Sequence, residues 1–339
     1  MPRLLLLTSS FPRSADDHRG GFVYEWCREL GRRGWPSTIV APDLPTGAFA
    51  EPGFGCTLAP LRYWTPRSSQ TLFHRDGVLT NIARDPRVAL QSFGFGLVVG
   101  AYLRTPPPAA IVVSHWLVPM GIVGAEICRR YGTPHLAICH SSDLALLERL
   151  PAGGAIARHL ARYSRRIVFV SSSHEARFRR LHGLPTLTTA VQPMGVPWLQ
   201  EIPETPHGTA SPSRGLRVGF LGRLVPLKGV DQLLEAAAGL TGVELRIGGE
   251  GPERRGLEAL ARARSVSVRF EGTIPASRRW EWLQELDALV VPSVRGPLGL
   301  VEGAPRVVLE AMSAGVPLIA SSVGGIPEIA AGAALLVPP

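Results

Sequence analysis

Two short segments in the second half of the sequence carry charged residues whose types and spacing suit the binding of an anion. In the first segment, GRLVPLKG, Arg223 and Lys228 lie between an apolar run and a helical pattern. Two cations beside the positive end of a helix dipole repel one another unless an anion lies between them, and a phosphate group would serve. Lys228 is the only lysine of the chain, which indicates that a compact ammonium group is needed there. The competing interpretation is a pair of solvated cations in a surface turn.

The second segment, VEGAPRVVLEAMSAGVP, places Glu302 and Glu310 with seven residues between them. Pro305 is suited to the first position of a helix, so that the free backbone N–H groups of Arg306 and Val307 would face an anion. Glu302 then lies just before the helix and Glu310 within it. Because apolar residues flank Glu310, we expect its carboxylate to enter a cleft and to accept hydrogen bonds from sugar or ribose hydroxyls. The competing interpretation is an ion pair between Arg306 and Glu310 on one helical face.

The elements that must position these residues are short apolar strands alternating with helices. In the first half we expect strands at 4–7, 39–40, 111–113, 136–138 and 167–170, and helices at 22–32, 121–130, 144–163 and 174–181. In the second half we expect strands at 216–221, 243–247, 266–270 and 288–291, and helices at 230–238, 253–263 and 277–285. This order predicts two doubly wound α/β domains with parallel sheets.

The sequence also suggests where the two domains meet. Residues 197–214 are rich in proline and polar residues and are typical of a linker, so we expect domains at 1–196 and 215–339. The stretch from Glu51 to Pro108 is rich in Pro, Gly and Phe, and we expect loops and irregular helices there. The sequence ends at Pro339, directly after a strand candidate, so we expect the second domain to be truncated.

Several motifs together resemble those of retaining glycosyltransferases of family 4, the glycosyl transferases group 1. GRLVPLKG at Gly222 resembles the phosphate-binding loop of this family, GGEGPE at Gly248 its glycine turn, and FEGTIP at Phe270 its base-contacting turn. EGAPRVVLEAMSAGVPLIASSVGGIPEI resembles its signature of two glutamates separated by seven residues. In the first half, TSSFPRSADDHRGG, SHWLVPMG, HSSD and VQPMGV resemble further motifs of the family. The resemblance extends over most of the chain apart from 51–108.

This resemblance implies an α/β protein of GT-B architecture, with two Rossmann-like domains facing across a cleft that holds a nucleotide-sugar donor. The expected catalytic residues are Arg223 and Lys228 on the diphosphate, Glu302 on the transferred sugar, and His140 approaching the sugar and phosphate. The expected substrate-binding residues are Gly20, Gly21, Gly222, Gly249, Thr273, Ile274, Gly303, Arg306, Val307 and Glu310, the last on the ribose. The resemblance implies no cofactor and no metal, and the chain has no Asp-x-Asp pair of the metal-binding type.

Three departures from the family pattern imply that donor contacts are rearranged. Ser141 stands where a glycine is usual, Met194 replaces an asparagine, and Pro305 removes one backbone N–H group. A lone histidine after a strand is often a packed or capping residue, which is the competing interpretation of His140. We place His115 near the acceptor without a catalytic role.

The resemblance implies transfer of a sugar, with retention, from a UDP- or GDP-sugar to a glycan or lipid-linked acceptor in cell-surface polysaccharide or glycolipid synthesis. The alternatives are a nucleotide-sugar epimerase or a phosphorylase on the same fold, or a non-catalytic nucleotide-sugar binder. A dehydrogenase is disfavoured, because Arg254 occupies the third glycine position of the pattern that begins at Gly249.

Charge and cysteine usage bear on partners and compartment. Residues 1–200 hold 22 arginines against 12 acidic residues, whereas the remainder holds 14 basic against 15 acidic residues. The basic first half predicts peripheral contact with an anionic membrane, or else a solvated arginine-rich surface. No recognition motif accompanies the charge, so nucleic acid is not an expected partner. The four cysteines show neither zinc-site nor disulfide spacing, and no apolar run is long enough to span a bilayer, which together predict a cytoplasmic protein.

Overall fold

The computed structural model describes residues 3–14, 17, 20–46, 49–74, 78–183, 187–196, 215–296 and 300–339. The expected linker at 197–214 lies outside the described residues. The chain divides into two compact units, one comprising Met1–Val170 and Glu175–Gln192 and the other Ser171–His174 and Pro193–Pro339.

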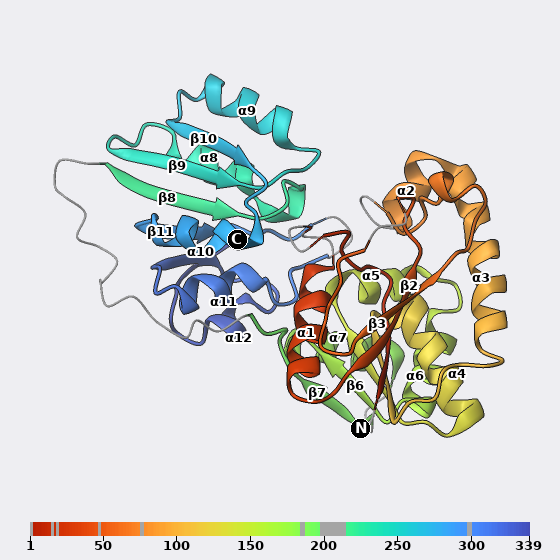
Figure 1. Cartoon of the computed structure of the whole chain (residues 1–339). Coiled ribbons are helices and arrows are strands. Elements are labelled where there is room, and N and C mark those ends of the chain that lie inside the picture. The colour runs from red at the N-terminus through yellow and green to blue at the C-terminus, as the bar shows by residue number, and fades with distance from the viewer. Residues whose placement is uncertain are drawn as a thin grey trace. The chain divides into compact units, whose positions relative to one another are not determined.

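The first unit is built on a seven-stranded parallel sheet in the order β3-β2-β1-β4-β5-β6-β7 (Figure 1). The strands are β1 (Leu4–Leu7), β2 (Ser37–Pro42), β3 (Thr57–Leu61), β4 (Ile111–His115), β5 (His135–Cys139), β6 (Arg166–Phe169) and β7 (Thr189–Val191). The helices are α1 (Gly21–Arg32), α2 (Val78–Arg84), α3 (Leu90–Tyr102), α4 (Ile122–Tyr131), α5 (Ser141–Arg149), α6 (Gly153–Tyr163) and α7 (Ser172–His182).

The apolar runs form parallel strands because both faces of this sheet are covered. Leu6 pairs in register with Ile39 on one side and Val113 on the other. Leu6 packs with α1, whereas Leu5 and Leu7 point to the opposite face and pack with residues of α3 and α4. The strand order reverses between β1 and β4, and ligands of open α/β sheets bind at the carboxyl ends of strands beside such a point.

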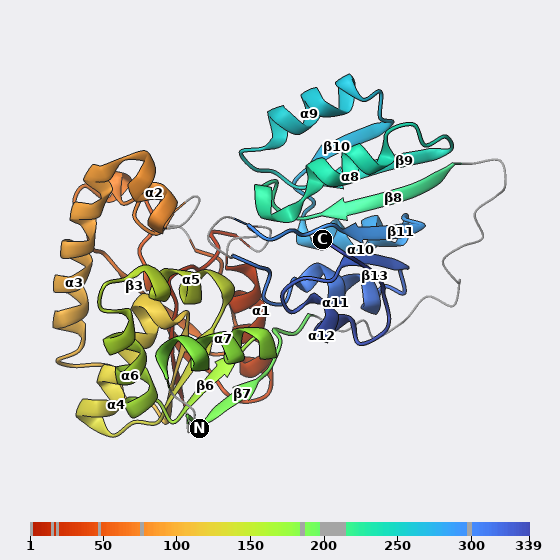
Figure 2. The ribbon, with the colours of Figure 1, turned by 180° about the vertical axis from the view of Figure 1, so that it is seen from behind.

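The second unit repeats the scheme with a six-stranded parallel sheet in the order β10-β9-β8-β11-β12-β13 (Figure 2). The strands are β8 (Leu216–Leu221), β9 (Val243–Gly248), β10 (Val268–Gly272), β11 (Ala288–Val291), β12 (Leu318–Ser321) and β13 (Leu335–Val337). The helices are α8 (Val230–Ala237), α9 (Arg254–Ala263), α10 (Ala276–Gln284), α11 (Arg306–Ser313) and α12 (Ile326–Ala330). Helices α8 and α9 pack on one face of the sheet, and α10, α11 and α12 on the other.

The expected fold class, two Rossmann-like α/β units, is confirmed, but two local expectations are wrong. The single helix expected at 144–163 is two helices, α5 and α6, interrupted at Pro151, where proline restricts the residue before it to extended conformations. The stretch 51–108 is not loops and irregular helices alone. It supplies the edge strand β3, paired in parallel with β2, and the 13-residue helix α3.

Both regular elements of this stretch were hidden by their composition. Strand β3 contains Pro60, and an edge strand tolerates a proline because the missing N–H group can face solvent. Helix α3 contains three glycines, whose low helix propensity is offset by packing of one face against the unit.

Candidate active site

The loop that follows β8 in the second unit is clamped by neighbouring backbone. Gly249 adopts φ 140°, and a Cβ atom there would overlap the carbonyl oxygen of Gly222. Gly229 adopts φ 61°, and a Cβ atom there would likewise overlap the carbonyl oxygen of Pro292, the residue after β11. The loop then turns at Pro226–Lys228 into α8. These glycines therefore let three strand ends approach closely enough to fix the backbone that carries Arg223 and Lys228.

Lys228 and Glu302 meet at the carboxyl end of this sheet. Lys228 Nζ lies 2.7 Å from Glu302 Oε1, and the two side chains are only 18% and 13% exposed. The contact has the distance of an ion pair but not the direction of a hydrogen bond, and Oε1 accepts no hydrogen bond from the described residues. Glu302 thus supplies the counter-charge for Lys228 that the sequence analysis assigned to a phosphate. An ammonium group has three donors, so Lys228 can contact a second anion without leaving Glu302.

The loop that carries Glu302 and Gly303 rests on two glycines that the sequence analysis did not single out. Gly324, at φ 61°, would overlap the carbonyl oxygen of Glu302 if it carried a Cβ atom, and Gly325 would overlap that of Gly303. The backbone N–H group of Gly325 donates to the carbonyl oxygen of Glu302 at 3.1 Å. The signal in the sequence is the Gly-Gly pair shortly after the apolar strand that ends at Ser321, because such a pair marks close backbone approach.

Glu310 lies within α11 and is held by an arginine that the sequence analysis missed. Arg279 Nη1, from α10, donates to Glu310 Oε1 at 2.9 Å, while Arg306 Nη2 lies 4.0 Å from the same oxygen. The ion pair of the competing interpretation, between Arg306 and Glu310, is therefore present at 4.0 Å, but the shorter contact is to Arg279. No local pattern could indicate this pairing, because it joins two different helices.

The remaining donor-side residues occupy two element ends. Pro305 is the residue before α11, so the helix begins at Arg306, and the side chain of Val307 is buried in the core. Ile274 is also buried and packs against Gly248, whereas Thr273, directly after β10, is exposed. A contact from Ile274 to a ligand would therefore have to come from its backbone.

In the first unit, His115 and His140 meet at the ends of β4 and β5. His115 Nδ1 lies 3.2 Å from His140 Nε2, and the two rings stack at 5.5 Å. Phe22 and Trp26 of α1 pack edge-on against His115. Burial, followed by the nearby His140, lowers the pKa of His115 well below its usual value, so His115 is neutral at physiological pH. Its ring therefore packs as a neutral imidazole against that of His140.

Gly20, Gly21 and Asp143 shape the backbone around this histidine pair. Gly20 adopts φ 70° against the carbonyl oxygen of Ser10, and Gly21 begins α1 with open space beside it. Asp143, three residues after His140, accepts a hydrogen bond from the backbone N–H group of Leu117 at 2.7 Å. Burial raises the pKa of this carboxyl group to about 7. The aspartate of the HSSD motif thus ties the segment after β4 to the start of α5.

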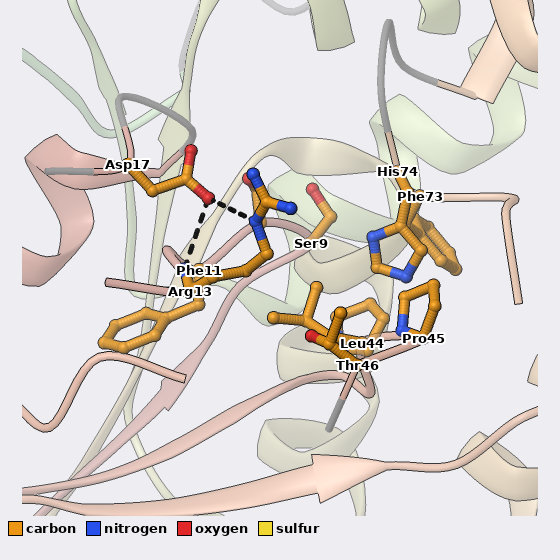
Figure 3. A pocket seen from close by; sticks show the side chains of 11 residues that line it. Ser9, Phe11, Arg13, Asp17, Leu44, Pro45, Thr46, Phe73 and His74 are labelled. Carbon is orange, nitrogen blue, oxygen red and sulfur yellow. Dashed lines mark hydrogen bonds and ion pairs between the residues drawn. The ribbon is translucent and has the colours of Figure 1, made fainter. Parts of the chain in front are cut away.

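The first unit also contains a pocket of about 180 Å³ at the carboxyl ends of β1 and β2 (Figure 3). Its lining combines hydroxyl groups of Ser9 and Thr46 with the apolar faces of Leu44 and Phe73. Arg13 Nε contacts Asp17 Oδ2 at 2.9 Å at one side of the pocket. The opposite side carries the imidazole of His74 (Figure 3). Polar groups beside apolar side chains are typical of a pocket for a small polar ligand.

The described ranges contain no disulfide, metal cluster or membrane-spanning helix. The four cysteines are free thiols. Within those ranges, no three His, Cys, Asp or Glu side chains are grouped so as to hold a metal ion. None of the helices there is both long and apolar enough to cross a bilayer.

Two Rossmann-like domains, each built on a doubly wound parallel sheet, are the architecture of GT-B glycosyltransferases, and here the second sheet carries a cation and a carboxylate at its carboxyl edge. The family model "Glycosyltransferase Family 4" matches residues 20–197, and "Glycosyl transferases group 1" matches residues 202–339. The chain belongs to glycosyltransferase family 4.

Relatives of known name agree with this class. The chain is 29% identical over 303 residues to the putative colanic acid biosynthesis glycosyltransferase WcaL of Escherichia coli, an alignment covering 85% of this chain and 69% of that protein. It is 32% identical over 206 residues to a GDP-mannose-dependent alpha-(1-6)-phosphatidylinositol monomannoside mannosyltransferase of Mycobacterium tuberculosis. That alignment covers 57% of this chain and 53% of the relative, so the chain spans about half the length of the mycobacterial protein.

Solved structures share the fold at low identity. Sucrose-phosphate synthase of Thermosynechococcus elongatus matches with a TM-score of 0.73 at 20% identity, covering 100% of this chain and 86% of that one. Anabaena HepE, in complex with UDP and glucose, matches with a TM-score of 0.69 at 17% identity over the same shares of the two chains.

Proposed function

We propose that this glycosyltransferase moves a sugar, with retention of configuration, from a UDP- or GDP-sugar to a glycan or lipid-linked acceptor in cell-surface polysaccharide or glycolipid synthesis. The proposal includes neither a cofactor nor a metal, because arginine and lysine supply positive charge to the diphosphate. The observation that carries it is the contact between Lys228 and Glu302 at the carboxyl edge of the second sheet.

The pair offers the two kinds of group that a nucleotide-sugar requires at its reacting bond. As the bond between the anomeric carbon and the diphosphate breaks, negative charge develops on the departing phosphate oxygen. Lys228 and Arg223 stabilise that charge, and such stabilisation is usually the largest single contribution to catalysis. Glu302, whose Oε1 accepts no hydrogen bond from the described residues, accepts from hydroxyl groups of the transferred sugar.

The rest of the nucleotide is bound by the neighbouring element ends. Glu310, oriented by Arg279, accepts from the ribose hydroxyls, because an oriented carboxylate loses little freedom when it binds. The backbone N–H groups at the start of α11 face the phosphates, and the turn at Thr273 and Ile274 contacts the base. His140 acts on the sugar and phosphate, with the neutral His115 fixing its ring.

The acceptor is the second part of the proposal. The pocket at the ends of β1 and β2 has hydroxyl, guanidinium and imidazole groups beside apolar surface, and a sugar ring presents the same mixture of polar edge and apolar face. The relatives support this class of acceptor, since one is named for colanic acid biosynthesis and another for a phosphatidylinositol mannoside.

We also propose a cytoplasmic location with peripheral contact to an anionic membrane face, where lipid-linked acceptors are presented. The support is the charge of residues 1–200, in which arginines exceed acidic residues by ten. Basic surfaces are attracted to anionic lipids, and salt weakens this attraction.

The decisive experiment combines UDP- and GDP-sugars with glycan and lipid-linked acceptors and follows the products by NMR. We expect a new glycosidic bond with the anomeric configuration of the donor, formed equally well after chelation of metals. Inverted product would contradict retention. Interconversion of the donor sugar without acceptor would indicate an epimerase, and donor binding without turnover a non-catalytic binder.

A further inference from the structure

The outer face of α3 exposes large apolar side chains that nothing in the proposed reaction uses. Leu90, Phe93 and Leu97 are 64%, 73% and 61% exposed, and their spacing of three and four residues places them on one side of the helix. Gly96 and Gly100 have open space beside them. The helix contains no charged residue from end to end, although a helix face in water normally carries polar and charged side chains.

The opposite face of α3 is firmly packed, so the helix cannot turn its outer face inward. Gly94 lies against the carbonyl oxygen of Tyr63. The centroid of the Phe95 ring lies 5.9 Å from that of Tyr63 and 4.7 Å from that of Phe73, so the three rings pack together. The side-chain oxygen of Gln91 accepts hydrogen bonds from the backbone of the segment at 71–72. Both ribbon views show α3 at the outer edge of the first unit (Figures 1 and 2).

Basic side chains stand at both ends of this apolar face. Arg84 and Arg87 are exposed just before α3, and Arg104 is exposed just after it. Residues 57–110 hold six arginines against two aspartates. One of the two aspartates, Asp85, accepts a hydrogen bond from the backbone N–H group of Arg87 and caps the turn before α3. Positive charge therefore flanks an uncharged apolar surface.

Two kinds of occupant could cover such a face, and the charge and area favour a lipid surface over a second copy of the chain. A stable protein interface buries roughly 800 Å² on each partner, more than three side chains of this size provide. A symmetric dimer through α3 would also bring the flanking arginines of two copies together. Anionic lipid headgroups attract arginine, and the acyl boundary beneath them accepts leucine and phenylalanine.

We propose that α3 docks the chain on an anionic bilayer, with Leu90, Phe93 and Leu97 in the acyl boundary and Arg84, Arg87 and Arg104 against the lipid phosphates. This inference deepens the membrane contact proposed above by naming the element and adding an apolar contribution to the electrostatic one. It follows that part of the binding energy is insensitive to salt.

The test is sedimentation of the full chain with vesicles of phosphatidylcholine alone or mixed with phosphatidylglycerol, at low and high salt. We expect binding to the mixed vesicles that high salt weakens but does not abolish. The variant Phe93→Ser/Leu97→Ser should bind about tenfold more weakly or worse at either salt concentration. The variant Arg87→Gln/Arg104→Gln should lose mainly the part of vesicle binding that high salt weakens. Leu240→Ser, which changes an equally exposed leucine of the second unit, is the matched control and should bind as the unchanged chain does.

Vesicle binding of Phe93→Ser/Leu97→Ser equal to that of the unchanged chain would overturn the proposal. So would a dimer of the unchanged chain that this variant dissociates, because the face would then be covered by a second copy. Donor turnover with a water-soluble acceptor is measured on the same samples. This turnover should be equal in the unchanged chain and in Phe93→Ser/Leu97→Ser. A loss of vesicle binding with full turnover is then distinguished from a failure of the proposed transferase reaction.

Discussion

At the scale of single residues, the ion pair between Lys228 and Glu302 is the feature on which the proposed chemistry depends most. Both side chains are more than four-fifths buried, so their charges interact more strongly than those of a solvated pair. The pair holds the ammonium group in place before a diphosphate arrives, and such preorganisation avoids reorientation of the catalytic charge during the reaction.

Two substitutions of Lys228 separate the contribution of its positive charge to catalysis from that of its geometry. Lys228→Ala should lower kcat by about 100-fold to 1000-fold, the usual effect of removing one preorganised donor to a developing oxyanion. Lys228→Arg should retain part of the rate, because the charge remains while the point of contact moves. Steady-state kinetics with the identified donor measure both. Arg264→Ala, which breaks an exposed pair with Glu235 in the same unit, is the control and should leave kcat unchanged. A folded Lys228→Ala protein with full kcat would refute the assignment.

The pair formed by Arg279 and Glu310 predicts a coupled effect on nucleotide affinity. Arg279→Ala and Glu310→Gln should each weaken binding of the nucleoside diphosphate about tenfold. The double variant should be little worse than either single one, with a coupling energy of about 1–2 kcal/mol. Titration calorimetry with UDP and GDP gives the four affinities of this cycle. Strictly additive losses would show that Arg279 does not orient Glu310.

At the scale of elements, the strand ends of the second unit are brought together by glycines. Gly249→Ala should lower the free energy of unfolding by about 2 kcal/mol or more and should displace the loop that carries Lys228, because its Cβ atom would overlap the backbone of Gly222. Gly256→Ala provides the matched control, since Gly256 lies within α9 with open space beside it. That change should raise stability by up to about 1 kcal/mol. Chemical denaturation gives the free energy of unfolding of both variants. Equal changes in Gly249→Ala and Gly256→Ala would contradict the close backbone approach at Gly249.

The packing of β4 against β5 predicts how stability changes with pH. His135 Nε2 lies 2.8 Å from Ser114 Oγ and His135 Nδ1 lies 2.9 Å from Ser164 Oγ, and burial lowers the pKa of His135 to about 3. The unfolded chain therefore binds a proton between pH 6.5 and 3 that the folded chain does not, so stability falls as pH drops through this window. Buried His115 acts in the same direction. Asp143, whose pKa burial raises to about 7, acts in the opposite direction, because the folded chain keeps a proton there that the unfolded chain has released.

Thermal unfolding of His135→Gln from pH 4 to pH 8 isolates this contribution. The variant should be less stable at pH 8 but should lose less stability on acidification, by up to about 1.4 kcal/mol per pH unit. A slope unaffected by His135→Gln would mean that His135 is not held neutral.

At the scale of the whole molecule, the chain consists of two units, each with apolar clusters on both faces of its own sheet. Charge is divided between them unevenly, since residues 1–200 are strongly basic and the remainder is nearly neutral. The unit with the cation and carboxylate pair is therefore not the more basic one. This separation agrees with a division of labour in which donor binding uses a few placed charges and membrane contact uses many distributed ones.

Two separate apolar cores predict two steps in thermal unfolding, and the step of the second unit should respond more strongly to nucleotide. Saturating UDP or GDP at about 100 times its Kd should stabilise the second unit by about 2.7 kcal/mol and raise its Tm by about 5–10 °C. The transition of the first unit should move less, because His140 is the residue of that unit assigned to the phosphate. Calorimetry with and without nucleotide shows which transition moves, and a shift confined to the first unit would contradict the donor site.

The sequence alone determined the two-unit α/β fold and the residue types of the site. Apolar runs such as Leu4–Leu7 and Leu216–Leu221 have the length and burial pattern of parallel strands. In the second unit, glycines 222, 229 and 249 mark the loops that follow β8 and β9. These signals are local, because backbone preference and hydrophobic periodicity act over a few neighbouring residues. The same local signals misjudged β3 and α3, whose proline and glycines are tolerated only in their packed context.

Only the tertiary structure decided which residues meet. Three pairs, namely Lys228 with Glu302, Arg279 with Glu310, and His115 with His140, each join segments that are distant in the sequence, and no periodic pattern links their members. The same holds for the exposed face of α3, since the inner and outer sides of that helix are almost equally apolar in the sequence. Contacts of this kind follow from packing in three dimensions, which brings together side chains that chain order keeps apart.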